Sequence, residues 1–303
     1  MLEFNKVKST YKGKVREIYA FENNKMLAIA SDRISAFDVI LPREIPFKGQ
    51  VLNKIAAYFL DATKDIVPNW LESMPFPNAS YGNYCEPIKI EMVIRGYLTG
   101  HAWRLYKSGV REICGNILPD GMKEHQKLDN PIITPATKAE EGHDEDISPA
   151  EIVNQEILDA ATFKKLEQIT RALYSRGVAM AHDRGLILVD TKYEFGILNG
   201  EVVLIDEIHT PDSSRYFYEN SYADNFNQGL PQRQLSKEFV REWLIENNFQ
   251  GLDGQTVPEM TDEFVASVTQ RYIELYETIT GNSFKKEEVP TNEVIVKQIN
   301  AMH

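Results

Sequence analysis

The segment GLILVDTKYEFGILNGEVVLIDEIHTPDSSR, residues 185–215, sets charged side chains into two short apolar runs that are joined by a turn. Leu186–Val189 and Val202–Ile205 predict buried strands. Asn199-Gly200 between them favours a type I′ turn, whose two central residues both need a positive φ. The segment therefore predicts a β-hairpin with a fixed register.

The charged residues of this hairpin predict a cation-assisted site. Asp190, Lys192 and Glu194 alternate along the first strand, so they share one face, while Asp206 and Glu207 end the second strand. Several carboxylates and one ammonium group are expected to converge there. Convergent carboxylates usually indicate a bound cation.

Composition excludes several classes of protein. The chain has 303 residues, 43% of them hydrophobic, which suffices for a large core and indicates two lobes. Its apolar runs fall far short of the roughly 20 residues of a membrane span, and MLEFNKVKST lacks the core of a secretory signal, so we expect a cytoplasmic location. The net charge of −12 argues against non-specific nucleic-acid binding. Cys85 and Cys114 lack metal-ligand spacing, which predicts reduced, structural thiols.

The order of elements predicts an α+β protein with a strand-rich amino-terminal lobe and a larger α/β lobe. Lys14–Phe21 and Met26–Ala30 predict a hairpin, and Ile88–Ile94 predicts a later strand. Residues 115–148 are polar and lack an apolar period, which predicts a long loop that becomes ordered on binding. We place the boundary after residue 110, giving a nucleotide-clasping lobe over 1–110 and a substrate- and metal-binding lobe over 111–303 that includes this loop.

Start and stop signals predict three helices. Ser148-Pro149-Ala150-Glu151 combines an N-cap, a proline at the first helical position and a capping-box glutamate. The apolar period continues from Phe163 to Met180, so we expect one helix that ends at Gly185. Further helices are expected over about 236–247 and 261–280.

Four other motifs are suited to binding anions or substrates, and each has a structural alternative. In YKGKVREIY, residues 11–19, Gly13, Lys14 and Arg16 could cover phosphates, or form a basic hairpin in solvent. SDRISAFD, residues 31–38, follows a strand, where sites are often built, but it also fits a turn that satisfies its own backbone.

The other two motifs lie further along the chain. In RGYLTGHAWR, residues 95–104, Arg95 could grip a phosphate or carboxylate, while His101 is a contact residue or a satisfied histidine. TPATKAEEGHDEDIS, residues 134–148, is either a solvated acidic loop or a substrate lid, and Lys138 and His143 favour the lid.

In this order the motifs GKVREIY, SDRISAFDV, RGYLTG, TKAEEGHDEDIS, LILVDTKYEFG and DEIHTPDSSR resemble the phosphoribosylaminoimidazole-succinocarboxamide synthase (SAICAR synthetase) family over nearly the whole chain, in its longer, yeast-like branch. The resemblance implies an ATP-grasp- or kinase-like SAICAR synthase fold. It also implies a carbon–nitrogen ligase (EC 6.3.2.6) of purine synthesis, which joins L-aspartate to carboxyaminoimidazole ribonucleotide with ATP and Mg²⁺. Many members have serine where this chain has His101.

The resemblance also implies roles for individual residues. Lys192, Glu194 and Asp190 would be catalytic, with Lys192 stabilising the transferring phosphoryl group. Asp206, Glu207 and Glu194 would hold Mg²⁺. ATP would contact Gly13, Lys14, Arg16, Glu86, Pro87, Lys192 and Glu194. The other substrates would contact Ser35, Asp38, Arg95, Gly100, His101, Lys138, His143, Asp144, Ser214, Arg215, Lys237 and Arg241.

Two other functions remain open at this stage. A small-molecule kinase would use the same glycine-lysine turn, lysine and acidic metal site. A non-enzymatic nucleotide-binding or scaffold protein is the third hypothesis. We expect no nucleic-acid or membrane partner, and the length of the chain favours a monomer over a dimer.

Overall fold

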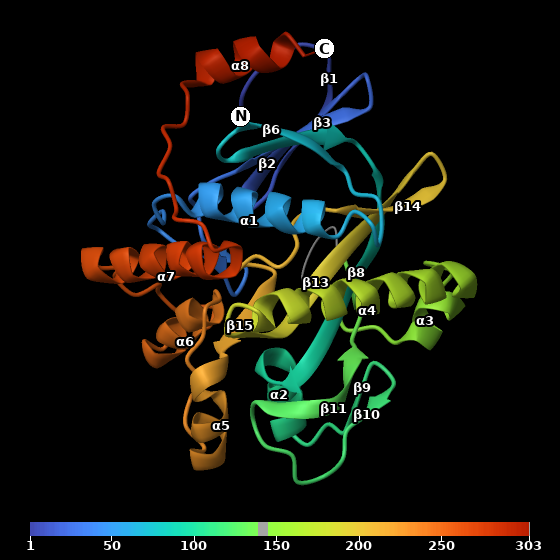
Figure 1. Cartoon of the computed structure of the whole chain (residues 1–303), viewed down its shortest axis with the longest axis vertical. Helices are drawn as coiled ribbons and strands as arrows, with labels where there is room; N and C mark the ends of the chain where they lie inside the picture. The colour runs from blue at the N-terminus through green and yellow to red at the C-terminus, as the bar shows by residue number, and fades with distance from the viewer. Residues whose placement is uncertain (139–144, 303) are drawn as a thin grey trace. The chain divides into compact units, whose positions relative to one another are not determined.

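The computed structural model describes residues 1–138 and 145–302 (Figure 1). The chain divides into two compact units: unit 1 comprises Met1–Asp61, Trp70–Cys85 and Lys237–His303, and unit 2 comprises Ala62–Asn69 and Glu86–Ser236. This division differs from a single boundary after residue 110, because the carboxy-terminal segment packs with the amino-terminal strands. Within the described residues, no helix is long and apolar enough to cross a membrane.

Unit 1 is built on a five-stranded antiparallel sheet of order β1-β2-β3-β7-β6. Its strands are β1 (Val7–Lys12), β2 (Arg16–Phe21), β3 (Lys25–Ala30), β6 (Leu71–Phe76) and β7 (Ala79–Asn83), and a short pair is formed by β4 (Ser35–Ala36) and β5 (Val39–Ile40). The β2–β3 pairing confirms the first predicted hairpin.

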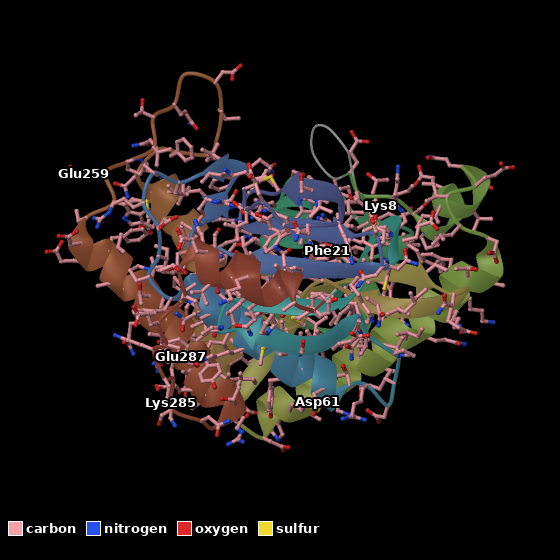
Figure 2. The ribbon with its side chains drawn as sticks, turned by 90° about the horizontal axis from the view of Figure 1, so that it is seen from above. Lys8, Phe21, Asp61, Glu259, Lys285 and Glu287 are labelled. Carbon is pink, nitrogen blue, oxygen red and sulfur yellow. The ribbon has the colours of Figure 1, made fainter. Side chains whose placement is uncertain are left out.

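The helices of unit 1 are α1 (Lys48–Ala62), α6 (Glu238–Glu246), α7 (Asp262–Thr280) and α8 (Asn292–Asn300). Ile295 and Ile299 of α8 share a buried cluster with Tyr19 and Phe21. Figure 2 shows Phe21 among the strands, whereas Lys285 and Glu287, ahead of α8, lie toward the outside.

The predicted helices of unit 1 are confirmed, and their ends follow from capping. The Thr261 hydroxyl accepts a hydrogen bond from the Phe264 N–H at 3.2 Å, and Gly281 closes α7 with a φ of 73°. Helix α6, Glu238–Glu246, lies within the helix predicted over about 236–247.

Unit 2 is built on a six-stranded antiparallel sheet whose path is β11-β8-β13-β14, with β12 also paired to β8 and β15 also paired to β13. Its strands are β8 (Glu86–Leu98), β11 (Gln126–Ile133), β12 (Ala136–Thr137), β13 (Leu186–Leu198), β14 (Glu201–Ile205) and β15 (Ser214–Tyr218), and a short pair is formed by β9 (Glu112–Ile113) and β10 (Asn116–Ile117). Antiparallel sheets and separate helices confirm the α+β class.

The predicted hairpin over residues 185–215 is confirmed in register and turn. Leu198 pairs with Glu201, and the φ angles of Asn199 and Gly200 are 53° and 82°. Both values are positive, as a type I′ turn requires. The hairpin is longer than the two apolar runs, because β13 continues through its charged residues to Leu198.

The helices of unit 2 are α2 (Gly100–Lys107), α3 (Pro149–Asn154), α4 (Ala160–His182) and α5 (Glu219–Gln228). Helix α4 packs on the sheet beside β13, where the Tyr174 hydroxyl lies 2.9 Å from the Leu188 carbonyl and 3.1 Å from that of Val189 (Figure 1). This contact holds the helix against the strand that carries the charged residues.

Two predictions for unit 2 are wrong in detail. Residues 115–148 are not one loop, because β10, β11 and β12 lie within them and both ends of β11 pair with β8. The single helix from Ser148 to Gly185 is interrupted between α3 and α4, since Asp159 caps a new helix by accepting from Ala161 N and Thr162 N, both at 2.9 Å. The capping box at Ser148 and Glu151 is confirmed.

Candidate functional site

Asp190 is the centre of a buried ionic trio in unit 2. Its carboxylate accepts from Arg95 at 3.2 Å and also pairs with Arg215. The three side chains are 5%, 8% and 13% exposed, respectively. Strand pairing explains the convergence, because Asp190 on β13 has Arg95 on β8 and Arg215 on β15 as its two register partners. Guanidinium groups outnumber carboxylates in this trio, so it suits a negatively charged ligand.

Two residues complete the surroundings of the trio. The Arg95 Nε donates to the Thr134 hydroxyl at 2.9 Å. A Cβ atom at Gly100 would lie 2.3 Å from the Arg215 guanidinium, so that side chain would have to shift. Gly100 also has a φ of 56°, which glycine adopts readily. Gly100 therefore lies directly beside the trio.

Lys192 is the centre of a second ionic cluster on the same strand. Its ammonium lies 2.7 Å from the Glu91 carboxylate and 2.9 Å from that of Glu194. Lys138 pairs with Glu194 as well. The structure thus brings Lys192 and Glu194 together, as predicted, and places Lys138 beside them.

Electrostatics keep Lys192 and Glu194 ionised. Burial opposes the charge on Lys192, but the carboxylates of Glu194, Glu91 and Asp206 hold its pKa well above the ordinary value. Burial would raise the pKa of the Glu194 carboxyl, yet the charges of Lys192 and Lys138 hold it far below its usual range. Fixed charges of both signs are suited to stabilising a charge that moves during a reaction.

The end of β14 carries the two other predicted metal ligands. Asp206 has a φ of 59° and lies close enough to raise the pKa of both Lys192 and Lys138. Glu207 is buried and accepts from the Thr210 hydroxyl at 2.9 Å, which ties it to the following turn. Within residues 1–138 and 145–302, no group of three or more His, Cys, Asp or Glu side chains has the arrangement of a metal site.

Two further predicted residues of unit 2 have defined partners. The Ser214 hydroxyl donates to the Thr191 hydroxyl at 2.8 Å. Ser214 precedes Arg215 of the trio in the sequence, and Thr191 follows Asp190. His101 Nε2 lies 2.8 Å from the Asp146 carboxylate. The hydrogen bond from His101 lowers the pKa of Asp146, so the pair joins α2 to the segment before α3.

The Gly13-Lys14 turn and the SDRISAFD motif meet within unit 1. Lys14 pairs with Asp38, and the Arg33 Nε donates to the Lys14 carbonyl at 2.9 Å. Ser35 is buried in β4. Arg16 begins β2, so both basic residues of the turn border this cluster.

The remaining predicted residues have less distinctive surroundings. Lys237 immediately precedes α6, and Arg241 in its first turns pairs with Glu238 at 2.8 Å. Glu86 and Pro87 are exposed at the start of β8. His143 and Asp144 lie outside the described residues.

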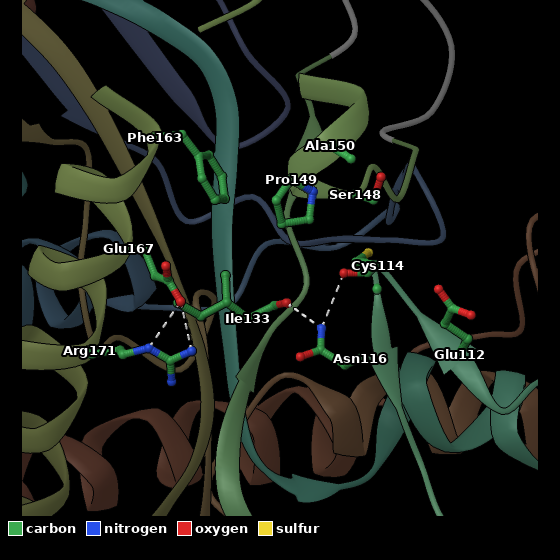
Figure 3. A pocket seen from close by; sticks show the side chains of 11 residues that line it. Glu112, Cys114, Asn116, Ile133, Ser148, Pro149, Ala150, Phe163, Glu167 and Arg171 are labelled. Carbon is green, nitrogen blue, oxygen red and sulfur yellow. Dashed lines mark hydrogen bonds and ion pairs between the residues drawn. The ribbon is translucent and has the colours of Figure 1, made fainter. Parts of the chain in front are cut away.

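A cavity of about 380 Å³ in unit 2 is lined by residues other than the predicted site residues (Figure 3). Arg171 and Glu167 of α4 are ion-paired at 2.9 Å on one side of it. On the other side the Asn116 amide donates to the Ile133 carbonyl at 2.8 Å. None of the predicted residues is among the described residues that line this cavity.

Sequence reasoning missed Glu91 as a member of the Lys192 cluster. It lies in an ordinary strand segment, EPIKIEMVI, and its partner is distant in sequence. One signal was present, because Glu91 is an acidic residue at the centre of a predicted buried strand, where charges are rarely found without a partner.

Comparison with known proteins agrees with these motifs. The model of the SAICAR synthetase family matches residues 9–256. The chain is 60% identical over 282 residues to the phosphoribosylaminoimidazole-succinocarboxamide synthase of Bacteroides thetaiotaomicron, covering 93% of this chain and 90% of the relative. It is 60% identical over 290 residues to the Cytophaga hutchinsonii protein of that name, covering 95% of this chain and 93% of the relative.

Solved structures show the same similarity. The SAICAR synthase of Saccharomyces cerevisiae, solved as a complex with SAICAR, matches with a TM-score of 0.79 and 32% identity over 94% of this chain and 99% of that chain. A type-2 SAICAR synthetase in complex with ADP shares the fold, with a TM-score of 0.70 and 23% identity over 92% of this chain and 100% of that chain. This chain therefore belongs to the SAICAR synthetase family.

Proposed function

We propose that this protein is an ATP-dependent ligase that joins L-aspartate to the carboxylate of carboxyaminoimidazole ribonucleotide, giving SAICAR, ADP and phosphate in purine synthesis. Its family membership supports the reaction. The observation that carries the proposal is the pair of ionic clusters on one strand, where Asp190 joins two arginines and Lys192 joins two carboxylates. The first suits an anionic substrate and the second suits phosphoryl transfer.

The proposed chemistry activates a carboxylate before the amine attacks. A carboxylate oxygen of the ribonucleotide attacks the γ-phosphorus of ATP and releases ADP, which gives an acyl phosphate. The aspartate nitrogen then attacks the acyl carbon, phosphate leaves, and the nitrogen loses its proton. The protein supplies positioning and charge compensation for three anionic substrates.

We assign Lys192 to the transferring phosphoryl group, because its ammonium is held between two carboxylates and kept protonated. Gly13, Lys14 and Arg16 are proposed to bind ATP phosphates, and the backbone at Glu86 and Pro87 is proposed to contact adenine. The ADP complex of the type-2 relative is consistent with a nucleotide site in this family.

Mg²⁺ fits the donor chemistry of the Lys192 cluster. The ion commonly takes one or two carboxylates and completes its shell with water and phosphate oxygens. Glu194 and Asp206 supply such oxygens, and both act electrostatically on Lys192. Glu207 is the weaker candidate, since the Thr210 hydroxyl already binds it. When bound, Mg²⁺ would offset phosphate charge.

For the ribonucleotide we propose Arg95, Gly100 and Arg215 around Asp190, with Ser214 beside them. The relative solved with SAICAR supports a ligand of this class. The other proposed substrate contacts are Ser35, Asp38, His101, Lys138, His143, Asp144, Lys237 and Arg241. A cytoplasmic location and a monomeric state stay predictions.

An omission assay tests the proposal. Purified protein is incubated with ATP, Mg²⁺, the ribonucleotide and aspartate, and ADP and SAICAR are both measured. We expect equal amounts of the two products, and neither when aspartate or the ribonucleotide is left out. Steady ADP release without aspartate would indicate a kinase or an ATPase instead. The kinase alternative is not favoured, because the matching family and relatives are synthases.

A further inference from the structure

We propose that Glu91 is a positioning residue that holds the Lys192 ammonium in place for phosphoryl transfer. The inference rests on the proposed function of Lys192. It starts from a contact of 2.7 Å between the Lys192 Nζ and a Glu91 carboxylate oxygen. Both residues lie in unit 2, on the neighbouring strands β8 and β13.

The strand register makes Glu91 costly unless a cation lies beside it. Glu91 and Glu194 are Cα partners across β8 and β13. Like charges placed directly opposite one another destabilise a sheet. Their side chains are 11% and 6% exposed, so water screens them poorly. The Lys192 ammonium contacts both carboxylates and offsets this repulsion.

Stability alone does not account for a glutamate at this position. Glu91 lies between the fully buried Ile90 and Met92. Replacing a buried ion pair by apolar residues is often neutral or stabilising. Apolar residues in place of the whole cluster would serve the sheet at least as well, so its charges, the Glu91 carboxylate among them, point to a role in the reaction.

Glu91 supplies Lys192 with a second carboxylate partner from another strand. Glu194 is shared, because it also pairs with Lys138. It is a proposed Mg²⁺ ligand as well. The Glu91 carboxylate on β8 holds the Lys192 ammonium even while Glu194 binds its other partners. Two contacts define the position of the ammonium better than one.

Kinetics on Glu91→Gln test the proposal, because glutamine keeps the shape and removes the charge. We expect kcat to fall on the order of 10- to 100-fold with little change in the KM for ATP. Glu91→Asp should recover part of the loss. The matched control is Glu201→Gln on β14, which removes an exposed carboxylate from the same sheet and should leave kcat unchanged.

A double-mutant cycle separates positioning from a merely structural role. If Glu91 acts through Lys192, Glu91→Gln should add little to the loss caused by Lys192→Met. The proposal would be overturned if the fold-losses of kcat in the two single variants multiplied in full in the double variant. Wild-type kcat in Glu91→Gln would also overturn it.

A third readout does not depend on activity. In protein labelled with ¹⁵N-lysine and free of substrates, the Lys192 ammonium signal is assigned by its loss in Lys192→Met. Proton exchange with solvent should be several-fold faster in Glu91→Gln than in wild type or Glu201→Gln. Unchanged exchange would refute the role of Glu91 even if the wild type is active. A wild type that forms no SAICAR would refute the proposed function alone, while exchange would still decide the role of Glu91.

Discussion

Arg95 and Asp190 are paired both by backbone and by side chain. They are register partners in the β8–β13 ladder, and the Arg95 Nη1 lies 3.2 Å from an Asp190 carboxylate oxygen. The β13–β15 ladder gives Asp190 a second arginine, Arg215, in the same way. Backbone pairing thus fixes where the charges meet. A site built on strands is held more rigidly than one built on loops.

Asp190→Asn should destabilise the protein strongly. The change removes the carboxylate from two largely buried arginines, and loss of one partner from a buried ionic group typically costs about 3–5 kcal/mol. The free energy of unfolding in urea measures this. Glu167→Gln, which removes an exposed partner of Arg171, should cost less than about 1 kcal/mol. Equal effects of the two changes would show that burial of the trio is unimportant.

Lys192→Ala should abolish most turnover while the fold survives. The ammonium is proposed to stabilise transferred charge, and removal of one such group commonly costs about 10²–10³ in kcat. Turnover and the circular dichroism spectrum are measured together, with the exposed Lys165→Ala as control. Wild-type turnover in Lys192→Ala would remove this residue from the mechanism.

Acid should weaken the wild-type fold through His209. Burial lowers the pKa of His209 from 6.5 to about 3, so only the unfolded chain takes up this proton between those values. The neutral His209 ring therefore makes its full contribution to the free energy of unfolding above pH 6.5. Below that pH the free energy of unfolding falls by about 1.4 kcal/mol per pH unit.

The unfolding free energies of His209→Gln and wild type, compared from pH 7 down to pH 4, check this. The variant should show a shallower decline of the unfolding free energy than the wild type. Parallel curves for His209→Gln and wild type would contradict the assignment.

Gly200→Ala should cost about 1–2 kcal/mol through backbone conformation alone. Gly200 has a φ of 82°, and no described atom lies within 4 Å of a Cβ built there. Gly200→Asn should cost less, since asparagine tolerates positive φ better than alanine. Urea midpoints of the two variants give the comparison, and equal midpoints would argue against conformational strain at this turn.

Local signals made part of the fold predictable. Asn199-Gly200 fixed the turn of the central hairpin, and Ser148 with Glu151 fixed the start of α3. The break between α3 and α4 was missed because the apolar period runs through the Asp159 cap. Strand β11 was missed because its ends pair with β8, a strand distant in sequence, and this pairing leaves no local pattern.

The same reasoning applies to the site. Alternation along β13 predicted that Asp190, Lys192 and Glu194 share a face, but not that they divide into two clusters. That division depends on Arg95 and Glu91, which β8 places opposite different positions of β13. Register between strands about 100 residues apart leaves no local pattern in the sequence.

The central claim is that a substrate carboxylate is activated by ATP before the carbon–nitrogen bond forms. Ribonucleotide labelled with ¹⁸O in its carboxylate tests this most directly, with the released phosphate analysed by mass spectrometry. The account predicts one ¹⁸O atom in phosphate for each SAICAR formed, because the acyl phosphate loses its bridging oxygen with the leaving group. Phosphate without ¹⁸O would contradict it.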